Sequence, residues 1–166
     1  MKSWPHDGTM DWLWPAAERL GIPIARLAGD FLPLVGRIAE RHPGLKLIVD
    51  HFGVRRLNVD AAAFVTMPEV LALARYPNVA VKVTGGPQYV SDGYPFRTLT
   101  PRYKAIYDAF GPRRMFWGTD ITRMPCTWRA CVTAFTEHQT WIPAADLPLI
   151  MGRGIADWLG WQRKWD

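Results

Sequence analysis

Four short runs of apolar residues recur along the chain, spaced by roughly the 30 residues of a βαβ unit. Each run is rich in β-branched or aromatic residues and is bounded by Gly, Pro or Asn, which is typical of strands. The predicted strands are Ile22–Leu27, Leu45–Asp50, Val79–Thr84 and Arg114–Gly118. Three of the runs are almost continuously apolar, which indicates strands that are covered on both faces.

Helical periodicity fills the intervals between these runs. It predicts helices over Asp11–Leu20, Phe31–Arg41, Met67–Arg75, Pro101–Phe110, Thr127–His138, Ala144–Met151 and Gly154–Leu159. Alternating strands and helices indicate a parallel sheet with crossover helices. We therefore expect a single α/β domain over residues 1–166, made of four consecutive β/α units.

Two architectures fit four such units: an open doubly wound sheet, and the second half of a (β/α)₈ (TIM) barrel. Periodicity alone does not separate them. No glycine-rich phosphate-binding motif follows any predicted strand, so a nucleotide-binding sheet has no support. The long segment 85–99 follows the third strand, at the end where such folds carry their functional loops.

Composition narrows the classes of partner. The formal net charge is +5, but Lys and Arg are scattered without a basic stripe, which disfavours nucleic-acid binding. No apolar run reaches the ~20 residues of a membrane-spanning helix, and the amino terminus lacks the pattern of a signal peptide. We expect a cytoplasmic protein with no membrane partner. Cys126 and Cys131 lack metal-site spacing and are expected to be packed free thiols.

Polar residues stand at the carboxyl ends of the last three predicted strands. Strand alternation places Lys82 on the face opposite the valines of its strand, and the same counting places His51 and Asp120 on the inward face. Asp50 then points the other way and is expected to be a structural partner. Because buried lysines are rare unless paired, Lys82 is expected to meet Asp120 or a substrate carboxylate.

A histidine and an aspartate that converge in a pocket suit metal binding or general base catalysis. Each residue also has a purely structural interpretation. His51 alone is more often a buried, hydrogen-bonded side chain, and Asp120 alone is as readily the N-cap of the turn that follows it.

Four segments together carry a resemblance to a known family. RIAERHPGLKLIVDHFG, with His51, resembles the sixth-strand region of amidohydrolase-related (amidohydrolase 2) proteins, and NVAVKVTGGPQY resembles their seventh strand. MFWGTDITRMPC, with Asp120, is similar to their eighth-strand motif, and IMGRGIADWLGW is similar to their closing helix. The segments occur in the family's order and cover nearly the whole chain.

The resemblance implies a (β/α)₈ barrel and hydrolysis of a small carboxylated compound such as a lactone, amide or ester. It implies that Asp120 activates water and that His51 is catalytic, with His51 and Asp120 as tentative ligands of a divalent metal, zinc being one candidate. Lys82, Arg123 and Tyr89 are the expected substrate-binding residues. Alternatives are a decarboxylase of the same family, or a non-catalytic half-barrel that assembles with itself or a partner.

Two departures from the family pattern bear on the metal. The H-x-H pair of the family's first strand is absent from this chain, and the fifth-strand histidine is replaced within the run IPIARLAGD. Two ligands are fewer than the three protein ligands of a catalytic zinc site. A half-barrel also leaves two sheet edges unpaired, so we expect a homo-oligomer that closes them.

Overall fold

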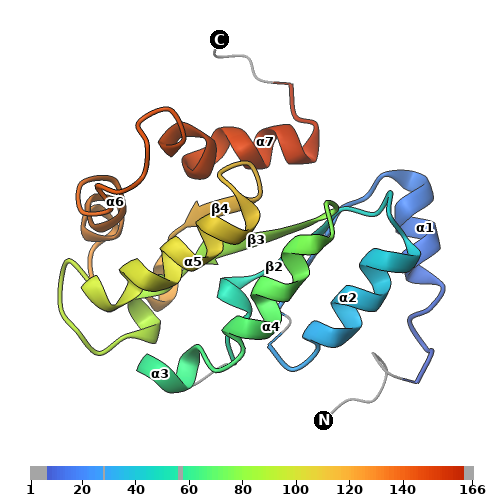
Figure 1. The fold of residues 1–166 in the computed structure, drawn as a ribbon, viewed down its shortest axis with the longest axis horizontal. Helices are drawn as coiled ribbons and strands as arrows, with labels where there is room; N and C mark the ends of the chain where they lie inside the picture. Colours follow the sequence, from blue (N-terminus) through green and yellow to red (C-terminus); the bar gives the residue numbers. More distant parts are fainter. Residues whose placement is uncertain (1–6, 28, 56–57, 163–166) are drawn as a thin grey trace.

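The computed structural model describes residues 7–27, 29–55 and 58–162. In these ranges four parallel strands form one sheet in the order β1-β2-β3-β4 (Figure 1). The strands are β1 (Ile24–Arg26), β2 (Leu47–Val49), β3 (Val79–Thr84) and β4 (Met115–Gly118). Each lies within a predicted run, which confirms the predicted parallel α/β sheet. β1 and β2 are shorter than predicted, although Lys46 and Asp50 on either side of β2 still share backbone hydrogen bonds with β1.

The helices are α1 (Leu13–Leu20), α2 (Leu32–Arg41), α3 (Asp60–Ala63), α4 (Met67–Ala72), α5 (Thr100–Phe110), α6 (Trp128–Thr136) and α7 (Gly154–Leu159). The short helix α3 was not predicted. The predicted helix Met67–Arg75 tightens into a 3₁₀ turn at its end, and most of the predicted helix Ala144–Met151 is instead a turn followed by the π-helical segment Leu149–Arg153. Within the described ranges, no helix has the length and apolar character needed to cross a membrane.

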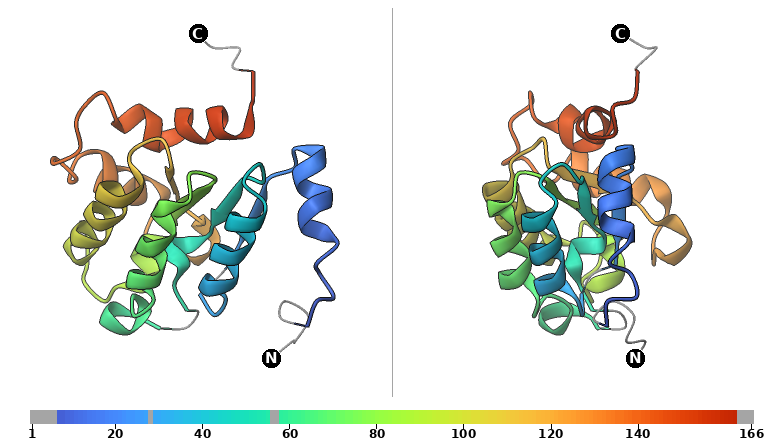
Figure 2. Two further views of the ribbon diagram at one scale, coloured as in Figure 1. Left: turned by 45° about the vertical axis from the view of Figure 1, so that its right-hand side comes forward. Right: turned by 90° about the vertical axis from the view of Figure 1, so that its right-hand side faces the viewer.

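One face of the sheet carries the main hydrophobic core. Helices α2, α4 and α5 lie side by side over this face (Figure 1, Figure 2). The valines of β3, Val79, Val81 and Val83, are completely buried beneath them. Each fully buried aliphatic side chain of this kind contributes about 1.5–3 kcal/mol relative to an exposed one. The continuous apolar pattern of β3 thus reflects a strand that is packed on both faces.

The opposite face of the sheet carries a second, smaller apolar cluster. Ile48, Ala80 and Phe116, one from each of β2, β3 and β4, are covered by Ile155 and Trp158 of α7. The ammonium of Lys46, just before β2, donates to the backbone carbonyl of Trp158 at 2.6 Å. Helix α7 therefore covers this face near the amino ends of the strands, as Figure 1 also shows. The polar residues considered next lie at the other end.

Candidate active site

The turn after β2 places Asp50 and His51 differently from the prediction. β2 ends at Val49, Asp50 is still extended, and His51 and Phe52 both adopt left-handed backbone conformations, with φ of 51° and 57°. Strand alternation therefore stops before His51. Asp50 keeps the phase of Ile48 and faces the α7 side of the sheet, so the predicted outward orientation of Asp50 is wrong.

Asp50 is the partner of Lys82. The Nζ atom of Lys82 donates to Oδ1 of Asp50 at 2.7 Å, and 29% of the lysine and 18% of the aspartate side chain are exposed. The sequence predicted the inward orientation of Lys82 and the need for a carboxylate partner, but Asp50, not Asp120, fills that role. The three-donor ammonium keeps further N–H groups for another acceptor.

The left-handed turn brings His51 to Thr84 and Asp120. Nδ1 of His51 lies 2.7 Å from Oγ1 of Thr84 and 3.4 Å from its backbone carbonyl. Nε2 of the same ring lies 3.8 Å from Oδ2 of Asp120. Thr84 thus engages one ring nitrogen and leaves the other facing the carboxylate. The expected convergence of His51 and Asp120 is observed, although the alternation argument that predicted it does not reach His51.

Asp120 lies two residues after β4 in a left-handed conformation, with φ of 53°, immediately before the 3₁₀ turn Ile121–Arg123. Its backbone carbonyl accepts from the Arg123 amide at 3.0 Å, but its side chain makes no capping hydrogen bond. The N-cap interpretation is therefore not supported. The half-buried carboxylate, 28% exposed, is directed instead at His51.

Gln88 is a residue that sequence reasoning missed. Its Nε2 atom is buried and has no hydrogen-bond partner among the described residues. A Cβ built on Gly85 would lie 2.4 Å from this nitrogen and 3.6 Å from Cβ of Asp120. The amide of Gln88 therefore lies over the bare backbone of Gly85, beside Asp120. The Gly85-Gly86 pair after β3 was the available signal, because glycine in such a place often marks a close approach to the backbone.

Arg123 and Tyr89 are the remaining two predicted site residues, and they differ in exposure to solvent. Arg123 is exposed in the 3₁₀ turn that follows Asp120. Tyr89 belongs to the main core and is only 5% exposed. The structure therefore does not bring Tyr89 to the open side of the His51–Asp120 pair, and its role as a substrate contact stays a prediction.

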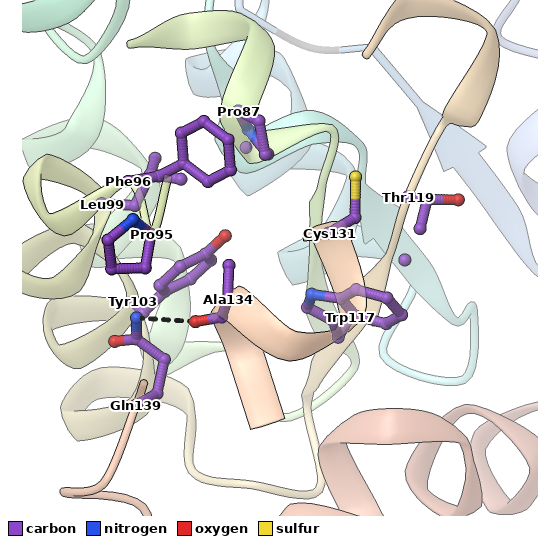
Figure 3. A pocket seen from close by; sticks show the side chains of 12 residues that line it. Pro87, Pro95, Phe96, Leu99, Tyr103, Trp117, Thr119, Cys131, Ala134 and Gln139 are labelled. Carbon is purple, nitrogen blue, oxygen red and sulfur yellow. Dashed lines mark hydrogen bonds between the residues drawn. The ribbon is translucent and has the colours of Figure 1, made fainter. Parts of the chain in front are cut away.

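A closed cavity adjoins the site without forming part of it. It lies between the segment after β3, the end of β4 and helix α6, and the side chains around it are mainly apolar (Figure 3). Its volume is about 10 Å³, which is room for about one water molecule. This cavity is therefore too small to hold an organic substrate.

The described residues do not complete a metal site. His51 and Asp120 are potential ligands, but no cluster of three or more His, Cys, Asp or Glu residues occurs in the described part of the chain. A catalytic zinc takes three protein ligands and one water. The residues present therefore do not fit a complete zinc site.

Comparison with known proteins gives one family and several solved structures of similar fold. The amidohydrolase family model matches residues 1–166. An amidohydrolase from Burkholderia multivorans with bound zinc superposes with a TM-score of 0.81 at 20% identity, over 95% of this chain and 59% of that one. A predicted 2-pyrone-4,6-dicarboxylic acid hydrolase from Pseudomonas putida gives 0.73 at 20% identity, over 99% and 60%. No curated protein matches the chain.

A third structure, a predicted 2-pyrone-4,6-dicarboxylic acid hydrolase from Acinetobacter baumannii with citric acid bound, gives a TM-score of 0.69 at 14% identity, over 91% of this chain and 57% of that one. The chain spans about 60% of the length of these proteins. The likeness establishes the fold class: the four parallel β/α units correspond to half of a TIM barrel.

Proposed function

Because the chain belongs to the amidohydrolase family, we propose that it acts as a hydrolase on a small carboxylated compound of the lactone, ester or amide type. The observation that carries the proposal is the approach of Asp120 to His51, with 3.8 Å between Oδ2 and Nε2, at the carboxyl ends of β2 and β4. In parallel α/β folds this edge is where substrates bind. Lys82 lies in the intervening strand and gives the same edge a cation.

Asp120 acts as the general base. Its carboxylate takes a proton from a water molecule while the water oxygen attacks the substrate carbonyl carbon, and the proton then passes to the leaving oxygen or nitrogen. His51 is the second catalytic residue: Thr84 engages its Nδ1, and its Nε2 orients the carbonyl group beside Asp120. The half-buried position of Asp120 strengthens its interaction with the attacking water.

Charge selects the substrate. Lys82, in the strand next to β4, and the exposed Arg123, in the turn after Asp120, attract a carboxylate on the substrate, since fixed cations stabilise anionic groups at such sites. The unpartnered amide nitrogen of Gln88 donates a hydrogen bond to a substrate oxygen. Two structural relatives bear names of dicarboxylate hydrolases, and one of them holds citric acid, which supports a carboxylated substrate.

No step of this proposal passes through a metal. A divalent metal, zinc being one candidate, stays a prediction for His51 and Asp120, and the relative with bound zinc supports it. In the described residues this pair lacks the third protein ligand that a catalytic zinc takes.

The test is product analysis on a small substrate panel. The purified chain is incubated with 2-pyrone-4,6-dicarboxylate, with uncharged lactones and with the corresponding carboxylated esters, and the products are identified by mass spectrometry. Ring opening or ester cleavage with addition of one water, restricted to the carboxylated members, supports the proposal. Release of carbon dioxide would instead identify the decarboxylase alternative, and no turnover of any member would favour the non-catalytic half-barrel.

A second experiment tests whether the charge of Lys82 selects the substrate. Lys82→Met removes the cation but keeps the length of the side chain, and Arg113→Met, a distant exposed arginine, is the matched control. We expect Lys82→Met to raise KM for carboxylated members about tenfold, the effect of losing ~1.4 kcal/mol of binding. An unchanged KM would remove Lys82 from substrate binding.

A further inference from the structure

The cysteines of the segment after β4 form a pair. Sγ of Cys126 and Sγ of Cys131 lie 3.5 Å apart. Cys126 stands just before the N-cap of α6, where the Thr127 side chain accepts from the Ala130 amide at 3.2 Å, and Cys131 lies in the helix itself. The cap fixes the start of the helix relative to Cys126, so both sulfurs are held at the same side of the first turns of α6.

The two thiols differ in access to solvent. Cys126 is half-buried, whereas Cys131 is 4% exposed and borders the closed cavity, with Trp117 and Thr119 near it (Figure 3). An external oxidant therefore reaches Cys126 first. The cavity leaves the Cys131 side chain some room to reorient toward its partner.

Burial, the hydrogen bond to Cys126 and the charge of the Cys126 thiolate together raise the pKa of the Cys131 thiol to about 12, and burial is the largest of the three causes. Oxidation of Cys126 removes the last two causes, because the modified sulfur carries no negative charge and no longer competes for the proton. Reaction at Cys126 thus lowers the pKa of Cys131 at the moment when Cys131 must act as a nucleophile.

We propose that Cys126 and Cys131 are a modification site that forms a reversible disulfide with a low-molecular-weight disulfide such as oxidised glutathione. The thiolate of Cys126 attacks one glutathione sulfur, which forms a mixed disulfide and releases one glutathione thiolate. The thiolate of Cys131 then attacks the Cys126 sulfur, which forms the internal bond and releases the second glutathione. The two cysteine protons end on the two glutathione thiols, and the two electrons from the cysteines reduce one glutathione disulfide.

The Cys126–Cys131 disulfide would link the segment that follows Asp120 covalently to helix α6. A disulfide holds its sulfurs at about 2.05 Å, so they must approach by about 1.5 Å. Cys126 lies in the same segment as the 3₁₀ turn Ile121–Arg123, which is hydrogen-bonded to the backbone of Asp120. Oxidation therefore restrains the segment that carries Arg123 and leads away from Asp120. The inference about the disulfide itself is independent of the proposed hydrolase activity.

The experiment is thiol counting by mass spectrometry after alkylation under denaturing conditions. The whole chain is exposed to excess oxidised glutathione at mildly alkaline pH, with and without later dithiothreitol. We expect the monomer to lose both alkylatable thiols without retaining glutathione, and to recover both after reduction. Cys131→Ser should trap glutathione on Cys126, whereas Cys126→Ser should leave Cys131 largely unmodified.

Three outcomes would overturn the inference. Wild-type chain that keeps both thiols, or that stops at a stable mixed disulfide, would show that the sulfurs do not close. Disulfides that join separate chains on a non-reducing gel would show that Cys126 reacts between molecules. Because Cys131 is buried and its replacement risks misfolding, Cys126→Ala offers a second test: circular dichroism should match wild type, and Cys131 should resist the oxidant.

Discussion

Lys82 and Asp50 form an ion pair between adjacent strands, with 2.7 Å between Nζ and Oδ1. The aspartate directly follows β2, and the lysine lies in β3, two residues before Thr84. The pair links the carboxyl ends of two strands and holds a cation near the His51–Asp120 pair. It therefore contributes both to the stability of the sheet edge and to the charge of the candidate site.

Asp50→Asn should destabilise the protein measurably. Removal of the carboxylate charge weakens the ion pair of a half-buried ammonium. Because the pair lies between the exposed and the fully buried case, we expect a loss of about 1–2 kcal/mol in the free energy of unfolding. The matched control is Asp108→Asn, which breaks the exposed Lys104–Asp108 pair within α5 and should cost under about 0.5 kcal/mol. Urea unfolding of both variants measures the difference, and equal losses would contradict a special role for the Asp50 pair.

Thr84 should act as a positioning residue for His51. Thr84→Val keeps the shape of this buried side chain but removes the 2.7 Å contact from its Oγ1 to the His51 ring. If the proposed hydrolysis occurs, we expect kcat to fall about tenfold, equivalent to ~1.4 kcal/mol, with little change in KM. Thr84→Ser, which keeps the hydroxyl, should recover most of the rate. A Ser variant as slow as the Val variant would show that packing, and not the hydroxyl, is what matters.

Zinc should bind this chain only weakly. The His51–Asp120 pair supplies two ligands, whereas a stable catalytic site takes three. We expect less than one zinc per chain to survive dialysis, as measured by plasma mass spectrometry, and the small bound fraction to disappear in His51→Ala but not in His138→Ala, which changes an exposed histidine of the α6 end. One tightly held zinc per chain that depends on His51 would contradict this expectation and support a metal-dependent mechanism.

The chain should self-associate through the edges of its sheet. In the described sheet β1 pairs only with β2, and β4 pairs only with β3, so each has one unpaired side. The Ile24 amide donates to Lys46 across the ladder, so the amide of the next residue, Ala25, is directed away from β2. Ala25→Pro removes that outward donor.

We predict that light scattering at micromolar concentration gives a mass above that of the monomer, and that Ala25→Pro lowers it while circular dichroism stays unchanged. The control is Asp108→Asn, an exposed change in helix α5, which should leave the mass unchanged. A clean monomer for the wild-type chain would contradict the prediction.

The alternation of side chains along a strand predicted some orientations in this chain and not others. Lys82 lies in the middle of a six-residue strand, so counting by two gave its orientation correctly. His51 comes after a strand of only three residues. Its own backbone and that of Phe52 are left-handed, so counting by two could not give the orientation of its side chain. Left-handed backbone in residues other than glycine is uncommon and leaves no periodic signal.

The contacts made by the loops could not be predicted from the sequence pattern either. The burial of Tyr89 in the main core and the position of Gln88 over Gly85 depend on how the 3₁₀ turn Gly86–Tyr89 folds back after β3. Hydrophobic pattern specifies which strand faces are covered, but it does not specify the path of a loop that is stabilised by tertiary contacts. The resemblance to the amidohydrolase family also singled out His51 and Asp120, and their catalytic roles stay predictions.

The central claim is that Asp120 activates water, and Asp120→Asn tests it most directly. The substitution keeps the size of the side chain but removes the base, so turnover of whichever carboxylated substrate the wild-type chain hydrolyses should fall at least about 100-fold, as expected for loss of general base catalysis. Asp108→Asn is the control and should keep the wild-type rate, with matching circular dichroism for all three proteins. Wild-type turnover in Asp120→Asn would contradict the account.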